Sequence, residues 1–126
     1  MKNTITWFEI NVANLKRSIK FYNHVLETEI RIMNMDDFPA MGVFPDEGVN
    51  GALVEEEGYE APEHSGVMLY FDGSTGIDSY LKRVEEAGGF IMVPRTIVTE
   101  DIRFWGAFED LDGNVLAFFE PPLISK

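Results

Sequence analysis

The chain has 126 residues and a mass of 14.3 kDa, which is the usual size of one domain. Apolar residues make up 45% and aromatic residues 13% of the sequence, so the chain can bury a core and is not intrinsically disordered. Ten basic and 22 acidic residues give a net charge of −12. That charge argues against nucleic-acid and anionic membrane partners and favours a cationic ligand or partner.

Cysteine is absent, which excludes thiol catalysis, Cys-ligated zinc, iron–sulfur clusters and disulfides. The N-terminal residues lack the pattern of a signal peptide, and no apolar run approaches the ~20 residues that span a bilayer. We therefore expect a soluble, cytoplasmic protein. The only histidines are His24, expected to be exposed on a helix, and His64, in an acidic loop. They leave little scope for histidine-based metal or acid–base chemistry.

The first half begins with a strand over residues 4–12, in which apolar and polar side chains alternate. One face carries Phe8, Ile10 and Val12, and the other carries Trp7, Glu9 and Asn11. Asn14 is placed to cap a helix over residues 15–26, whose apolar residues recur at helical spacing. Three further strands are predicted over residues 29–34, 38–45 and 51–55.

The second half repeats this order of elements. A strand over residues 66–72 precedes an amphipathic helix over residues 76–87. Strands are then predicted over residues 90–94, 103–109 and 115–120, with a turn at residues 110–114. The repetition indicates an internal duplication. We expect one α+β domain over residues 1–126, in which two tandem βαβββ modules (about 4–57 and 65–121) form a cup with a pocket on its concave face.

Two segments carry a family resemblance. Residues 14–22, NLKRSIKFY, resemble the D-L-x-x-S-x-x-F-Y opening helix of the glyoxalase/bleomycin-resistance/dioxygenase family, the vicinal oxygen chelate superfamily. Residues 108–114, FEDLDGN, resemble its F-x-D-P-D-G-N turn, with Leu111 in place of proline. Residues 51–53 and 87–89 fit a glyoxalase-like subgroup. The resemblance covers nearly the whole chain and implies the fold and a homodimer, but no single reaction.

The resemblance also bears on metal binding. Metal-dependent members place one His, Glu or Gln ligand on the first and one on the last strand of each half. The corresponding residues here are Trp7, Ala52, Val67 and Ala117. None of them has a donor atom that suits a divalent metal. The resemblance therefore implies that this chain lacks the family's metal site and needs no cofactor, although ligands completed across a dimer stay an open alternative.

Candidate site residues follow from the predicted concave face. Ligand-binding residues are predicted at Trp7, Glu9, Asn11, Ala52, Val67, Arg103, Trp105 and Ala117. Glu9 is the candidate catalytic residue, as a base, and the alternative is an ion pair with Arg31, Arg95 or Arg103. Trp7 provides a stacking surface or simply fills the space of a lost metal. Arg103 and Trp105 hold a substrate carboxylate or ring, or else lie on the surface and in a dimer interface.

Three functions fit these observations. The first is a metal-free binding protein that sequesters or senses a small apolar, aromatic or cationic compound. The second is an enzyme, either a glyoxalase-like lyase or isomerase or a dioxygenase-type protein with non-standard ligands. The third is an accessory subunit whose pocket is vestigial. We favour the first, with a small molecule as partner and neither nucleic acid nor membrane, because the four ligand positions are lost and Trp7 faces the expected cavity.

Overall fold

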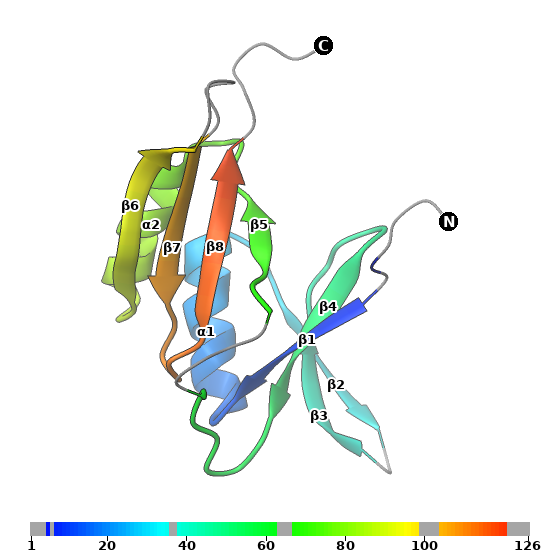
Figure 1. Ribbon diagram of the computed structural model, residues 1–126. Coiled ribbons are helices and arrows are strands. Elements are labelled where there is room, and N and C mark those ends of the chain that lie inside the picture. Colours follow the sequence, from blue (N-terminus) through cyan, green and yellow to red (C-terminus); the bar gives the residue numbers. More distant parts are fainter. Residues whose placement is uncertain (1–4, 6, 36–37, 63–66, 99–103, 121–126) are drawn as a thin grey trace. The chain divides into compact units, whose positions relative to one another are not determined.

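The computed structural model describes residues 5, 7–35, 38–62, 67–98 and 104–120 (Figure 1). The chain divides into two compact units, Met1–Ala61 and Pro62–Lys126. Each unit contains one helix and one four-stranded sheet in the order βαβββ. The predicted α+β class with two tandem modules is therefore confirmed. Neither helix in the described part of the chain has the length and hydrophobicity needed to cross a membrane.

The first unit follows the predicted order closely. Its elements are β1 (Trp7–Val12), α1 (Leu15–Leu26), β2 (Arg31–Met35), β3 (Phe38–Val43) and β4 (Asn50–Glu55). The sheet order is β1-β4-β3-β2, with β1 and β4 parallel and the other neighbours antiparallel. The helix has the predicted bounds, and the Asn14 side chain accepts a hydrogen bond from the Arg17 amide at 3.0 Å, as a helix N-cap does.

The second unit has the same topology with different strand lengths. Its elements are β5 (Tyr70–Asp72), α2 (Ile77–Glu86), β6 (Phe90–Ile97), β7 (Phe104–Glu109) and β8 (Val115–Glu120), in the sheet order β5-β8-β7-β6. The first strand is shorter than predicted, because it begins at Tyr70. The strand predicted to end at Pro94 continues to Ile97. Pro94 is tolerated because β6 is an edge strand whose pairing register shifts between Val93 and Thr96.

The turn between β7 and β8 is organised by the side chain of Asp110, which is 3% exposed. Its Oδ1 accepts hydrogen bonds from the amides of Asp112 and Asn114, each at 2.9 Å, and its Oδ2 accepts one from Asn114 Nδ2 at 2.9 Å. Gly113 has a φ of 87°, in the left-handed region that glycine tolerates. The predicted turn is confirmed. These bonds fix its geometry although Leu111 replaces the proline of the motif that the segment resembles.

Alternation along the strands separates a helix-facing side of each sheet from an open side. In the second unit, the Phe118 ring stacks on Tyr80 of α2 with centroids 4.7 Å apart. Trp105 and Phe119 have the opposite parity and therefore point away from α2. In the first unit, Ile10 and Val12 are buried while Trp7, Glu9 and Asn11 are exposed, as predicted.

Two glycines at corresponding places let the helices approach their sheets. Gly42 pairs with Leu53, and Gly106 pairs with Phe118. Both partners lie two residues before the end of the last strand of their unit. A Cβ at Gly42 would lie 3.0 Å from Ile19 of α1, and one at Gly106 would lie 2.9 Å from Ile77 of α2. A larger residue at either position would therefore require the neighbouring side chains to shift.

The last strand of each unit ends in a glutamate that caps the helix of the same unit. Glu55 Oε2 accepts a hydrogen bond from the Leu15 amide at 2.8 Å, and Glu120 Oε2 accepts one from the Ile77 amide at 3.2 Å. Both amides belong to the first residue of a helix, where no intrahelical acceptor exists and the helix dipole favours a negative charge. Each glutamate thus joins the last strand to the first turn of the helix.

Glu120 also has a second partner, Arg95. Arg95 Nη2 lies 2.6 Å from Glu120 Oε1, and the Arg95 guanidinium lies 3.6 Å from the centre of the Phe104 ring. The hydrogen bond from Arg95 lowers the pKa of the Glu120 carboxyl, and the Ile77 amide lowers it further against the opposing effect of burial. The carboxylate is therefore held in its ionised form where β6, β8 and α2 meet.

The cap at Glu55 gives a stability prediction. Replacing Glu55 with alanine should lower the free energy of unfolding by about 1 kcal/mol, because the first amide of α1 loses its acceptor. The shift is measured as a change in the urea midpoint. The control is Glu57→Ala, which removes the same charge from an exposed residue nearby and should leave the midpoint unchanged. Equal losses in the two variants would contradict the capping role.

Glu120 gives a prediction on pH dependence. Because its pKa is lowered in the folded state, its contribution is complete above the ordinary value of about 4.3 and is lost as the pH falls through the lowered value. The unfolding free energy of Glu120→Gln should therefore fall less than that of the wild type when the pH is taken from about 6 to about 3. Urea unfolding at several pH values measures this slope. The exposed Glu85→Gln control should keep the wild-type slope, and a wild-type slope in both variants would refute the prediction.

Candidate functional site

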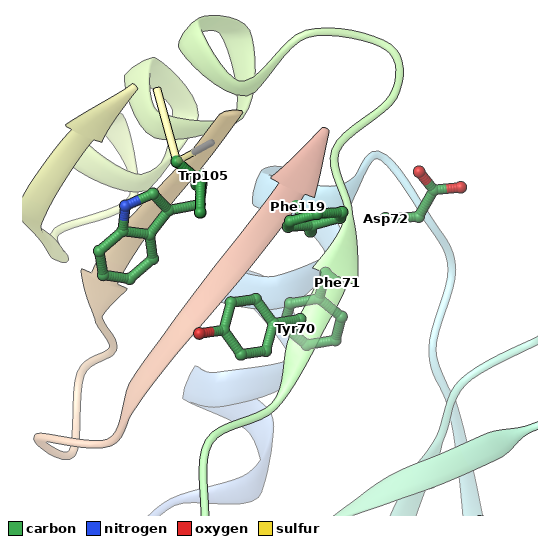
Figure 2. Close-up of a pocket in the computed structure, with 6 residues that line it drawn as sticks. Tyr70, Phe71, Asp72, Trp105 and Phe119 are labelled. Atoms are coloured by element: carbon green, nitrogen blue, oxygen red, sulfur yellow. The ribbon is translucent and has the colours of Figure 1, made fainter. Parts of the chain in front are cut away.

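A pocket of about 900 Å³ lies on the second unit. The described residues that line it are Tyr70, Phe71, Asp72, Val98, Trp105 and Phe119. They come from β5, from β7 and β8, and from the residue that follows β6. Figure 2 shows the rings of Tyr70, Trp105 and Phe119 gathered over these strands, with Asp72 at the end of β5.

The three rings belong to the open side of the sheet. Strand pairing sets Trp105 beside Phe119, and Tyr70 beside Ala117, two residues before Phe119. The Tyr70 ring centre lies 6.5 Å from that of Trp105 at an interplanar angle of 43°, and 6.4 Å from that of Phe119 at 86°. Tyr70 is 55% exposed, so much of its ring is available to another molecule. Phe71 has the opposite parity and contacts Phe108 and Phe118 on the helix side.

Asp72 supplies the formal charge among the described lining residues. Its Oδ1 accepts hydrogen bonds from the Ser74 amide at 2.9 Å and from the Ser74 hydroxyl. The hydroxyl and then the amide lower the pKa of the Asp72 carboxyl, and burial opposes them slightly. Oδ2 has no hydrogen-bond partner within the described ranges of the chain. The carboxylate lies at the margin of the pocket and not over the rings (Figure 2).

The predicted site residues of the first unit lie on the open side of its sheet. Trp7 Nε1 donates a hydrogen bond to Glu9 Oε2 at 3.2 Å, and both side chains are exposed, as is Asn11. Strand pairing places Glu9 beside the buried Ala52, whereas Trp7 pairs with Asn50. Trp7 and Ala52 are therefore not direct neighbours in the sheet. The predicted role of Glu9 as a catalytic base stays a prediction.

The predicted residues of the second unit are distributed differently. Trp105 lines the pocket, and Ala117 is buried beside Tyr70. Val67 is 77% exposed and precedes β5, so the neighbour of Ala117 is Tyr70 and not Val67. Arg103 and His64 lie outside the described residues. Of the eight predicted ligand-binding positions, the pocket thus contains Trp105.

Three residues of the pocket, Tyr70, Asp72 and Phe119, were not predicted from the sequence. Phe119 follows Ala117 by two residues, so strict alternation from Ala117 would have placed it on the same side of the sheet. Tyr70 and Asp72 were not found because the predicted strand placed Val67 on the open side. Leu69 and Phe71 would then lie on that side too, and Tyr70 and Asp72 would face the helix. The observed strand has the opposite parity, and a slip of one residue exchanges the two faces.

Within the described ranges, no group of three or more His, Cys, Asp or Glu side chains is arranged to hold a metal ion. The polar side-chain groups of the described pocket lining are the Asp72 carboxylate, the Tyr70 hydroxyl and the Trp105 indole N–H. This set suits a ligand that stacks on rings and meets a few polar groups at the edge.

Comparison with known proteins identifies the family. The sequence matches the Glyoxalase/Bleomycin resistance protein/Dioxygenase superfamily over residues 4–118, and the chain belongs to this family. No match to the chain was found among curated proteins.

Three solved structures illustrate the shared fold. A hypothetical protein from S. aureus is 21% identical, with a TM-score of 0.69 and 95% of each chain covered. A glyoxalase/bleomycin resistance protein from Albidiferax ferrireducens is 16% identical, with a TM-score of 0.74 over 94% of this chain and 99% of that one. Glyoxalase I from Zea mays is 20% identical, with a TM-score of 0.72, and the match covers 90% of this chain and 44% of that protein.

The hydrogen bonds of Asp72 give a prediction that can be read from a titration. Replacing Ser74 with alanine should raise the pKa of the Asp72 carboxyl toward its ordinary value, because the hydroxyl donor is lost while the amide remains. Carboxyl-carbon NMR of the labelled protein measures that pKa. Thr75→Ala, which instead removes a hydrogen bond to Tyr80, serves as the control. An unchanged Asp72 titration in Ser74→Ala would show that the hydroxyl does not stabilise the carboxylate.

Proposed function

We propose that the protein binds a small aromatic compound on the open side of the second unit and acts by sequestering or sensing it. The observation that carries this proposal is the group formed by Tyr70, Trp105 and Phe119. Aromatic pairs in offset or edge-to-face geometry contribute about 0.5–1.5 kcal/mol each beyond the area they bury. A planar ligand that meets several of these rings gains more than one such interaction.

The residues at the family's ligand positions support a binding role without the family's metal. The resemblance assigns Trp7, Ala52, Val67 and Ala117 to the positions where metal-dependent relatives carry donor side chains, and none of the four offers a suitable oxygen or nitrogen. Binding by ring stacking at Trp105 requires no metal. The function we propose is therefore recognition of an organic compound, with Tyr70, Trp105 and Phe119 as its main contacts.

An enzymatic function is the alternative. The likeness to glyoxalase I from Zea mays extends over 90% of this chain, and a glyoxalase-like lyase or isomerase, or a dioxygenase-type reaction, would use the same fold with other ligands. The two proposals differ in metal content. Elemental analysis of the untagged protein should show no stoichiometric divalent metal if the protein only binds, and a stoichiometric metal would favour the enzyme.

We also propose that the protein is a cytoplasmic homodimer. Support for association comes from large apolar side chains that are exposed along the edge strands of the two sheets. They are Ile32 and Met33 on β2, and Phe90, Met92 and Ile97 on β6. Apolar edge strands of this kind are protected in most proteins, often by association. Native mass spectrometry of the untagged protein measures the subunit number directly, and a monomer at micromolar concentration would contradict the dimer.

Binding at the aromatic group is tested with the neutral fluorophore N-phenyl-1-naphthylamine. Its emission should increase on addition of the protein, and Trp105→Ala should weaken the affinity about tenfold, the equivalent of about 1.4 kcal/mol. Trp7→Ala, which removes the other tryptophan from the first unit, should leave the affinity unchanged. Loss of affinity in Trp7→Ala alone would move the site to the first unit, and no binding by the wild type would overturn the proposal. Unfolding curves of both variants confirm that they fold.

A further inference from the structure

The described lining of the pocket is mostly aromatic, but it includes one negatively charged residue, Asp72. Asp72 lies at the margin of the rings, and no basic residue is found among the described lining residues. Arg95 of β6 is bound to Glu120, which caps α2 on the helix side of the sheet. Asp72 Oδ1 is fully used by Ser74, whereas Oδ2 has no hydrogen-bond partner in the described part of the chain.

Resting on the function proposed above, we infer that Asp72 selects the charge of the ligand, so that the pocket takes a planar organic cation in preference to a neutral or anionic compound of the same shape. The ring system of the ligand lies against Tyr70 and Trp105, and its positive charge or charged substituent lies toward Oδ2 of Asp72.

The rings themselves favour the same sign of charge. The face of an indole or phenol ring carries negative electrostatic potential, and an organic cation within about 6 Å of the ring centre gains about 0.5–1 kcal/mol at an exposed site. Tyr70 and Trp105 offer two such faces 6.5 Å apart, measured between ring centres. The net charge of −12 raises the local concentration of cations around the whole protein.

The duplicated architecture provides an internal comparison for Asp72. Asn11 pairs with Val54, and Asp72 pairs with Phe119. Val54 and Phe119 each precede the helix-capping glutamate, so Asn11 and Asp72 occupy equivalent places in the two units. The first unit has a neutral amide at this place and the second has a carboxylate. The fold therefore does not require an acid there, and the amide is a natural replacement for a test.

The decisive experiment compares three small probes by isothermal titration calorimetry. N-methylquinolinium is the cation, quinoline is the neutral analogue at pH 8, and 2-naphthoate is the anion of similar size. We expect the wild type to bind the cation several-fold more tightly than quinoline and to bind 2-naphthoate weakest. Raising the salt concentration should reduce the preference for the cation, because an exposed charge pair is screened by ions.

The variant Asp72→Asn keeps the oxygen that accepts from Ser74 and removes the charge. It should bind N-methylquinolinium about fivefold more weakly, the upper range for an exposed charge pair, and bind quinoline as the wild type does. Glu85→Gln is the matched control, because it removes one negative charge from an exposed position on α2. It should leave all three affinities unchanged.

The outcomes separate the two proposals. Equal binding of cation and quinoline, or an unchanged cation affinity in Asp72→Asn, would overturn the charge selection while the aromatic site stands. Tightest binding of 2-naphthoate, lost in Arg103→Ala, would also overturn it and assign the selection to Arg103. Failure of the wild type to bind any of the three probes and N-phenyl-1-naphthylamine would remove the aromatic site itself.

Discussion

Parallel pairing of the first and last strands within each unit is the constraint on which the rest of the structure depends. It brings β1 next to β4 and β5 next to β8, although a helix and two strands separate them in the sequence. The end of the last strand therefore lies beside the start of the helix. Glu55 and Glu120 use this proximity to satisfy the first amide of α1 and α2. The two bonds join residues that are 40 positions apart in the first unit and 43 positions apart in the second.

The same pairing creates the candidate site. With β8 between β5 and β7, side chains from three strands are brought to one side of the sheet, and the helix occupies the other. Tyr70, Trp105 and Phe119 meet there because each has the parity that points away from α2. Asp72 is placed at their margin by the end of β5, where the chain turns toward α2 and Ser74 reaches back to the carboxylate. The short strand β5 thus contributes both the Tyr70 ring and the Asp72 carboxylate to the pocket.

Much of the fold was predictable from the sequence, because its signals are local. The stripe of apolar residues and Asn14 defined α1 to the residue, and the residues from Asp110 to Asn114 carry the groups that build their own turn. The capping glutamates could not be found in this way, since their partners are distant in sequence. The site was predicted only in part. Trp105 was identified, but the bounds of β5 were misjudged, and strand parity is lost when a strand's register is displaced by one residue.

The two units differ more in the residues on the open sides of their sheets than in those that face the helices. Equivalent places on the open sides hold Glu9 and Tyr70, Asn11 and Asp72, Val54 and Phe119, and Met41 and Trp105. The helix-facing places, by contrast, keep a glycine under each helix and an apolar residue beside it. Inheritance of a duplicated sheet therefore separates two kinds of change. Substitutions on the helix-facing side alter the stability of the unit, whereas those at exposed places on the open side can change what the sheet binds without disturbing its packing.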